Sequence, residues 1–207
     1  MTDIRNDVDE QQLQRWTAAT CTGLADLLAA GPDDAWDAAT LCAGWQARHV
    51  VAHVTMPARL TAEQFGAEMT AAGGSFDRLS DTVAARDASL PPGELEDALR
   101  SPALHTWEPP GGGAIGALSH AVIHSLDVTI PRGRPPVAPA EAVSAVLDHL
   151  AAAEGAVFGI DLAGVRLEAT DTGRSWGDGE PVRAESGALV ALLSGRTLPD
   201  GRALPRR

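Results

Sequence analysis

The sequence has 207 residues, of which 44% are hydrophobic and 21% charged, a composition typical of a globular protein with one substantial domain, or one domain plus a small appendage. Its formal net charge of −12 argues against nucleic acid and against an anionic membrane as the main partner, because both attract a basic protein surface. Two cysteines, Cys21 and Cys42, are too few for a disulfide framework and the N-terminus has no apolar signal core, so we expect a cytoplasmic protein.

The spacing of hydrophobic residues predicts a mainly helical chain up to residue 160. After an acidic N-terminus that we expect to be frayed, apolar positions recur at threes and fours and predict helices over residues 9–30, 44–72, 75–86, 94–100, 114–130 and 139–158. Pro57 is expected to kink or split the second of these helices, and residues 101–113 are predicted to form a loop. No uninterrupted apolar run approaches the roughly 18 residues that suggest a membrane span.

The pattern changes after residue 160. Residues 165–169 alternate like a strand, residues 170–179 are a Gly/Asp-rich turn region, and residues 181–184 are predicted to be the return strand of a hairpin. A short helix is predicted over residues 186–193. The sequence therefore predicts a helical bundle over residues 1–160 and a small α/β module, a β-hairpin plus a helix, over residues 161–207.

Four of the six histidines form two HxxxH pairs, His49 with His53 and His120 with His124. Residues four apart share one helix face, so each spacing suits two imidazoles that bind one ion, and Asp127 shares the face of His124. His53, His120 and His124 lie in apolar helix segments, where an unpaired ring is costly to bury. For any single histidine a hydrogen-bonded core position is the ordinary alternative. Two pairs on two predicted core helices favour a metal site, although spacing leaves open whether the helices face each other.

Several short motifs occur in the order and spacing of a known family. They are LCAGW at residues 41–45 with VVAH at 50–53, HAVIHSLD at 120–127, and the C-terminal segments GVRL at 164–167, TD at 170–171, SWG at 175–177 and ALLSGR at 191–196. Together they resemble the mycothiol-dependent maleylpyruvate isomerase family, which belongs to the DinB-like superfamily of metal-binding four-helix bundles. The resemblance covers nearly the whole chain.

The resemblance implies a DinB-like four-helix bundle with His53, His120 and His124 as metal ligands. Three nitrogen ligands leave one coordination position open, which is typical of a catalytic site. The implied metal is zinc, with iron and nickel as alternatives, and the implied co-substrate is mycothiol or a similar low-molecular-weight thiol. Coordination would lower the pKa of the thiol, whose sulfur would then attack a small electrophilic substrate.

The sequence departs from the family at three positions. The best-known enzyme of the family has a glutamate where this chain has His120, and family members commonly have an acidic residue where it has His49 and often an arginine where it has Gly116. An all-histidine triad makes the site more cationic. We expect Asp127 and His49 to act beside the metal in catalysis: Asp127 fixes a ligand ring or a helix end, and His49 is a donor near the ligands or a surface residue rather than a fourth ligand.

Other residues are candidates for contact with the thiol or the substrate. They are Trp45, Arg59, His105 and Trp107, each with packing or solvent exposure as the alternative. Three functions stay open: a metal-dependent thiol S-transferase or isomerase, a thiol-independent Lewis-acid enzyme of a biosynthetic pathway, and a non-catalytic module that binds a small molecule. We expect a monomer or a homodimer.

Overall fold

The computed structural model describes residues 8–207, so most of the N-terminal stretch expected to be frayed lies outside the described residues. In chain order the helices are α1 (Glu10–Ala29), α2 (Ala47–Val54), α3 (Met56–Arg59), α4 (Ala62–Ala71), α5 (Phe76–Asp87), α6 (Pro92–Leu99), α7 (Pro102–His105), α8 (Gly113–Thr129), α9 (Ala140–Ala152) and α10 (Ser186–Leu193). Short 3-10 turns are η1 (Asp33–Asp37), η2 (Ile130–Arg132) and η3 (Ala156–Phe158). The mainly helical prediction is confirmed.

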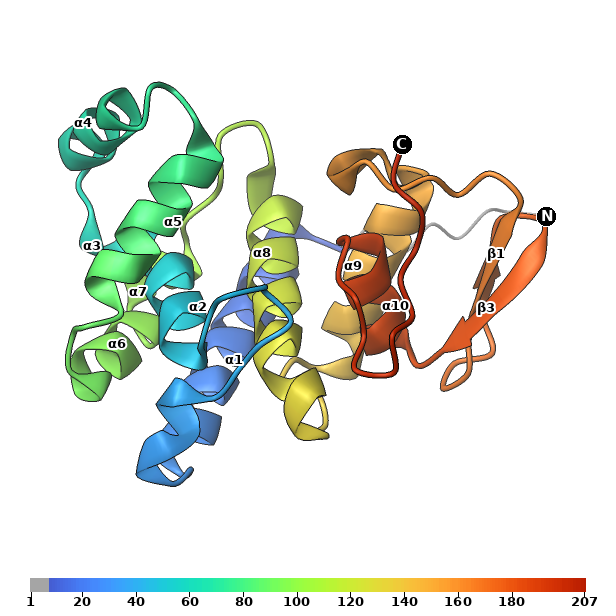
Figure 1. The fold of residues 1–207 in the computed structure, drawn as a ribbon, viewed down its shortest axis with the longest axis horizontal. Helices are drawn as coiled ribbons and strands as arrows, with labels where there is room; N and C mark the ends of the chain where they lie inside the picture. Colours follow the sequence, from blue (N-terminus) through green and yellow to red (C-terminus); the bar gives the residue numbers. More distant parts are fainter. Residues whose placement is uncertain (1–7) are drawn as a thin grey trace.

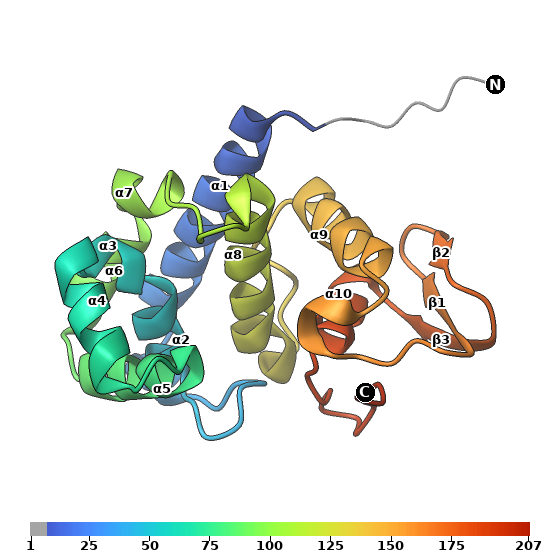
Figure 2. The same ribbon diagram turned by 90° about the horizontal axis from the view of Figure 1, so that it is seen from above.

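Helix α8 lies in the middle of the molecule and belongs to two hydrophobic cores (Figures 1 and 2). On one side it packs with α1, α2 and α6, through residues such as Leu24, Val50 and Leu99. On the other side it packs with α9, α10 and the sheet, through residues such as Leu147 and Leu189. A helix that is covered on most of its surface is expected to be apolar nearly all round.

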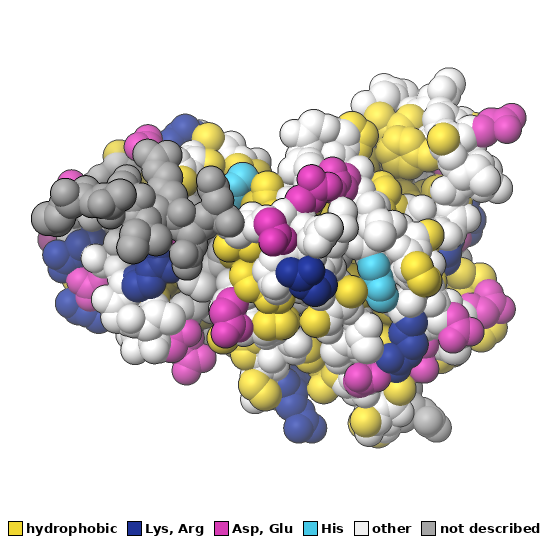
Figure 3. All heavy atoms as spheres, turned by 180° about the vertical axis from the view of Figure 1, so that it is seen from behind, with side chains coloured by type: hydrophobic (Ala, Val, Ile, Leu, Met, Phe, Trp, Pro, Cys, Tyr) yellow, Lys and Arg dark blue, Asp and Glu magenta, His cyan; other side chains and the backbone are white. Residues whose placement is uncertain are grey.

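The apolar character of α8 also meets a simple test for membrane helices. The stretch Gly113–Arg132 is long and apolar enough to cross a membrane, but 67% of its most apolar window is buried inside the protein. A buried core helix passes the same test, so this stretch is weak evidence for a membrane span. On the face of the molecule shown in Figure 3, charged side chains of both signs are interspersed with hydrophobic ones.

The predicted long helix over residues 44–72 is split into α2, α3 and α4. Pro57 causes the break between α2 and α3, as expected from the sequence, because it has no backbone N–H to continue the helical hydrogen bonds. It lies in the first turn of the separate helix α3. Leu60 is extended, and Thr61 then begins α4 with a capping box in which its side chain accepts a hydrogen bond from the backbone of Gln64. The two breaks bend the chain away from α8 and leave space beside the histidines.

The strands form one three-stranded sheet in the order β2-β1-β3, with β1 at Val165–Ala169, β2 at Ser175–Trp176 and β3 at Glu180–Ala184. The predicted hairpin between β1 and β3 is wrong. Strand β3 pairs with β1 in parallel, and the short strand β2 is the antiparallel partner of β1. After β2 the chain crosses the start of β1. A Cβ at Gly179 would lie 2.1 Å from the Gly164 carbonyl oxygen, so this crossing requires glycine.

Two smaller details of the sequence-based prediction also differ from the structure. Helix α9 ends at Ala152, and Gly155, with φ at 75°, turns the chain into η3 instead of continuing the helix to residue 158. The predicted loop 101–113 contains α7, which Ser101 caps by accepting a hydrogen bond from the Ala103 N–H. The division into a bundle over 1–160 and a module over 161–207 stays a prediction, and α8, α9, α10 and β1 share one core across that boundary.

Candidate metal centre

The two segments predicted to carry metal ligands face each other. His53 comes from the last turn of α2, and His120 and His124 come from consecutive turns of α8. Nε2 of His53 lies 3.0 Å from Nε2 of His120, and the ring centroids of the three histidines are 4.8 to 4.9 Å apart. One ring nitrogen from each residue lies within 4.8 Å of the others, so the three side chains can converge on a single ion.

The electrostatic environment keeps two of these rings uncharged. Burial is the main cause that lowers the pKa of His53 to about 3, and the neighbouring His124 lowers it further. Burial also lowers the pKa of His120 well below its usual value, again with the other two histidines contributing. Nδ1 of His53 is buried and has no hydrogen-bond partner among the described residues. Imidazole binds a metal in its neutral form, so the residues present fit a divalent ion.

Asp127 fixes the ring of His124. Its Oδ2 lies 2.9 Å from Nδ1 of His124, which therefore donates its proton to the carboxylate and keeps Nε2 as the free nitrogen. Arg196 donates from Nε to Oδ1 at 2.8 Å and from Nη2 to Oδ2 at 3.0 Å. Burial alone would raise the pKa of Asp127, but the hydrogen bonds from His124 and Arg196 outweigh it and lower the pKa to about 2.

Cys42, His124 and Asp127 form a second cluster with the composition of a metal site. The Sγ of Cys42 donates to Oδ2 of Asp127 at 3.0 Å, and burial, followed by the charge of Asp127, raises the pKa of this thiol to about 12. Cys42 is therefore a protonated hydrogen-bond donor, and the Asp127 oxygens are already engaged by Arg196 and His124. With both Asp127 oxygens engaged in this way, the cluster is a hydrogen-bonded support for the histidine triad.

The structure does not bring three of the predicted residues to the triad. Nδ1 of His49 accepts a hydrogen bond from the backbone N–H of Gln46 at 3.3 Å and caps α2, and its role beside the ligands stays a prediction. His105 is bound through Nε2 to the carbonyl oxygen of Leu99 at 2.8 Å. Arg59 forms an ion pair with Asp87, which joins α3 to α5. All three side chains are engaged within the fold.

The two predicted tryptophans both lie beside a histidine of the triad. The ring centroid of Trp45 is 5.3 Å from that of His53, and Trp45 also packs on the core between α1 and α2. The Trp107 centroid is 5.8 Å from that of His120, and Trp107 lines the cavity in front of the triad. Trp45 therefore packs between the core and His53, whereas Trp107 lies between His120 and the cavity.

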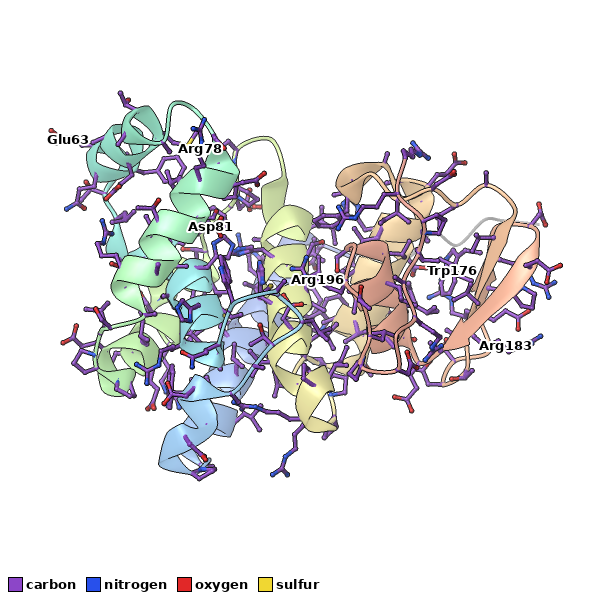
Figure 4. The ribbon with its side chains drawn as sticks, in the orientation of Figure 1. Glu63, Arg78, Asp81, Trp176, Arg183 and Arg196 are labelled. Atoms are coloured by element: carbon purple, nitrogen blue, oxygen red, sulfur yellow. The ribbon has the colours of Figure 1, made fainter. Side chains whose placement is uncertain are left out.

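A cavity of about 950 Å³ opens in front of the three histidines. Its wall includes Trp107, Arg196 and Ser119, whose buried hydroxyl has no hydrogen-bond partner among the described residues. Arg196 follows α10 and reaches toward α8 (Figure 4), 69 positions along the chain from Asp127. Arg196 was not predicted to lie in the site, although it ends the ALLSGR motif that supports the family resemblance. The fold and this site define a helical bundle with a buried three-histidine centre at the base of a ligand-sized cavity.

Comparison with known proteins finds a family that part of this bundle resembles. Residues 17–108 match the family model described as the mycothiol maleylpyruvate isomerase N-terminal domain, and the resemblance expected from the motifs is confirmed. No curated protein matches the sequence significantly.

Two solved structures share the fold of the whole chain. A crystal structure of the mycothiol-dependent maleylpyruvate isomerase matches with a TM-score of 0.61, and a histidine-to-alanine mutant of that enzyme matches with 0.62. Each is 16% identical and the match covers 100% of both chains. The predicted bundle with a small C-terminal α/β part is therefore confirmed as a fold.

Proposed function

We propose that this protein is a metal-dependent enzyme of the mycothiol-dependent maleylpyruvate isomerase type, which activates a low-molecular-weight thiol for transfer to, or isomerisation of, a small electrophilic substrate. The observation that carries the proposal is the convergence of His53, His120 and His124 at the base of the cavity, two of them held neutral. A structural metal site would be closed by protein ligands, whereas this one faces a space that a thiol and a substrate could enter.

The three histidines would hold the ion through one ring nitrogen each. Imidazole ligands suit zinc, and they also accept iron and nickel. When bound, a divalent ion in such a site lowers the pKa of a coordinated thiol and so supplies a nucleophilic sulfur at neutral pH.

The remaining side chains would orient the reactants. Asp127 commits Nδ1 of His124 to a hydrogen bond and so holds that ring in one tautomer. Arg196 donates one N–H to each Asp127 oxygen and one to the carbonyl of Ser194. One N–H on Nη1 and one on Nη2 remain available to bind a polar group of the substrate. The free hydroxyl of Ser119 adds one more donor.

A conjugation assay tests the proposal. The zinc-loaded protein is incubated with mycothiol and 1-chloro-2,4-dinitrobenzene, and the conjugate is measured by mass spectrometry. We expect conjugation well above the uncatalysed rate, its loss in His53→Ala, and its retention in the control His105→Ala, whose ring lies outside the cavity. No conjugate above background with several electrophiles would contradict a thiol-dependent function.

The outcomes also separate the other candidate functions. Turnover that depends on the metal and not on a thiol would indicate a Lewis-acid enzyme. A protein that binds no metal and is unchanged in His53→Ala would indicate a non-catalytic binding module. The proposal includes a cytoplasmic monomer or homodimer without a nucleic-acid or membrane partner.

A further inference from the structure

Exposed apolar side chains are concentrated at the mouth of the cavity. Among the described residues the large hydrophobic side chains that stand exposed are Phe76 (49%), Val157 (52%) and Phe158 (36%), and all three line the cavity in front of the histidines. Scattered single hydrophobic residues are ordinary on a protein surface, but a group around one opening marks a binding site for an apolar molecule.

The two sides of the opening come from distant parts of the chain. One side is formed by α3, α4 and α5, with Met56, Phe65, Met69 and Phe76, and the other by η3 with Val157 and Phe158. Helix α4 has no fully buried residue. Its Phe65 and Met69 pack on the small core of Met56, Leu79 and Val83 and face the cavity at the same time. The side of the cavity formed by α3, α4 and α5 is therefore mainly apolar from the opening inward.

Apart from an ion held by the three histidines, the cavity wall offers little positive charge to a substrate. Arg196 is the single arginine among the lining residues, which also include the exposed His149, and the carboxylate of Asp127 balances the charge of Arg196 through two hydrogen bonds. Gly116 of α8 contributes no side chain to the wall, and the loop packs closely against it, since an added Cβ would lie 2.9 Å from Cγ of Pro109. Glu108, at the exposed edge, is acidic.

We propose that the cavity binds an electrophile with an extended apolar body and a single polar head, rather than a small dicarboxylate. The head lies at the triad and the free N–H groups of Arg196, and the apolar body extends past Phe76, whose ring centroid is 6.3 Å from that of His53, toward Val157 and Phe158 at the rim. The volume of about 950 Å³ is at the upper end of the range for small-molecule sites, which suits an elongated ligand. The electrophilic character of the ligand rests on the proposed function, whereas its shape and polarity are inferred from the cavity.

Binding of a chain-length series tests this inference without catalysis. The zinc-loaded protein is titrated by calorimetry with hexanoate, octanoate, decanoate and dodecanoate, and with maleate as the small dicarboxylate. Each buried methylene is expected to tighten binding about fourfold. Affinity that does not change with chain length, or maleate binding more tightly than decanoate, would overturn the inference.

Surface substitutions at the rim supply the matched variants. Val157→Ser and Phe158→Ser change exposed side chains, so the fold should be retained, which the thermal unfolding midpoint checks. We expect the double variant to weaken dodecanoate binding at least fivefold and to leave hexanoate binding within twofold. The control is Leu162→Ala, a partly buried leucine outside the cavity, which should change neither. Equal weakening of both ligands in the rim variant would contradict an apolar site at the rim.

The results separate this inference from the proposed function. Chain-length-dependent binding without thiol conjugation would support the apolar site and contradict the thiol enzyme, whereas conjugation with no chain-length dependence would do the reverse. If the rim instead buries a second copy of this chain, dodecanoate will not bind and the double rim variant will convert a dimer to a monomer in light scattering, which would overturn the inference.

Discussion

Asp127 and His124 lie one turn apart on α8, and their side chains are joined by a hydrogen bond of 2.9 Å between Oδ2 and Nδ1. Because Asp127 is fully buried and also binds Arg196, this one carboxylate connects a candidate metal ligand to the end of α10. The C-terminal part of the chain therefore supports the ligand geometry, and changes there should be measurable at the metal.

Asp127→Asn should weaken both the metal site and the fold. The amide cannot balance the charge of Arg196 or accept the same bonds, so we expect metal affinity to fall about 10- to 100-fold and the free energy of unfolding to fall by about 3 kcal/mol. Zinc titration against a competing chelator and denaturant unfolding measure the two effects. The control is Asp148→Asn, which removes a half-exposed ion pair with Arg174 and should cost less than about 1 kcal/mol with no change in metal affinity.

The metal-free protein should lose stability as the pH falls below about 6.5, the usual pKa of histidine. The pKa of His53 is lowered to about 3 and that of His120 lies well below its usual value, so the unfolded chain binds protons in this range and the native protein does not. Each buried ring should cost about 1 kcal/mol per pH unit below that point. In the double variant His53→Leu, His120→Leu, unfolding measured by denaturant should depend less on pH. An equal slope in both proteins would show that other groups govern acid unfolding.

The sequence predicted the triad better than its surroundings. Two HxxxH pairs in apolar segments pointed to His53, His120 and His124, because the spacing of a helix is local information. His49 has the same spacing but stands in the first turn of α2, where its ring accepts the N-cap backbone hydrogen bond. Arg196 could not be located by spacing, because only the packing of α10 against α8 brings it to Asp127.

The sheet shows the same limit. The alternation of β1 and the position of β3 were predicted from local pattern, but which edge β3 takes depends on the path after Trp176. The two-residue strand β2 is too short to be recognised by alternation, and it fills the antiparallel edge of β1. Gly177 and Gly179 then allow the chain to pass the start of β1.

Asp87→Asn should destabilise the junction of α3 and α5. Asp87 is buried and binds both Arg59 and Arg86. Burial raises the pKa of Asp87, but the hydrogen bonds from Arg86 and Arg59 outweigh it and the net pKa is lowered, so its stabilising effect is present at neutral pH and lost as the pH falls through the native pKa. We expect a loss of about 2 kcal/mol at pH 7 that shrinks below pH 4. Asp200→Asn, an exposed pair with Arg202, should be nearly neutral at both pH values, and a similar loss there would contradict this assignment.

Gly179→Ala should disrupt the crossing after β2. Its φ is 137°, and the added Cβ would collide with the Gly164 carbonyl, so unfolding should become easier by about 2 kcal/mol or more. Gly173→Ala is the matched comparison, since its φ of 69° carries the left-handed strain but its Cβ would meet nothing within 4 Å. It should cost about 1 kcal/mol. Thermal unfolding of both variants checks the difference, and equal costs would mean that the close approach to Gly164 does not constrain the turn.

The metal stoichiometry of the triad tests the central claim most directly. Elemental analysis of the purified protein, after removal of loosely bound ions and reloading with zinc, should give one ion per chain. His53→Ala, His120→Ala and His124→Ala should each lower the zinc affinity more than about 100-fold, a larger loss than removing a residue that only orients a ligand, whereas His105→Ala should retain wild-type affinity. Zinc binding that is absent from the wild-type protein, or that survives unchanged in the three alanine variants, would contradict the account.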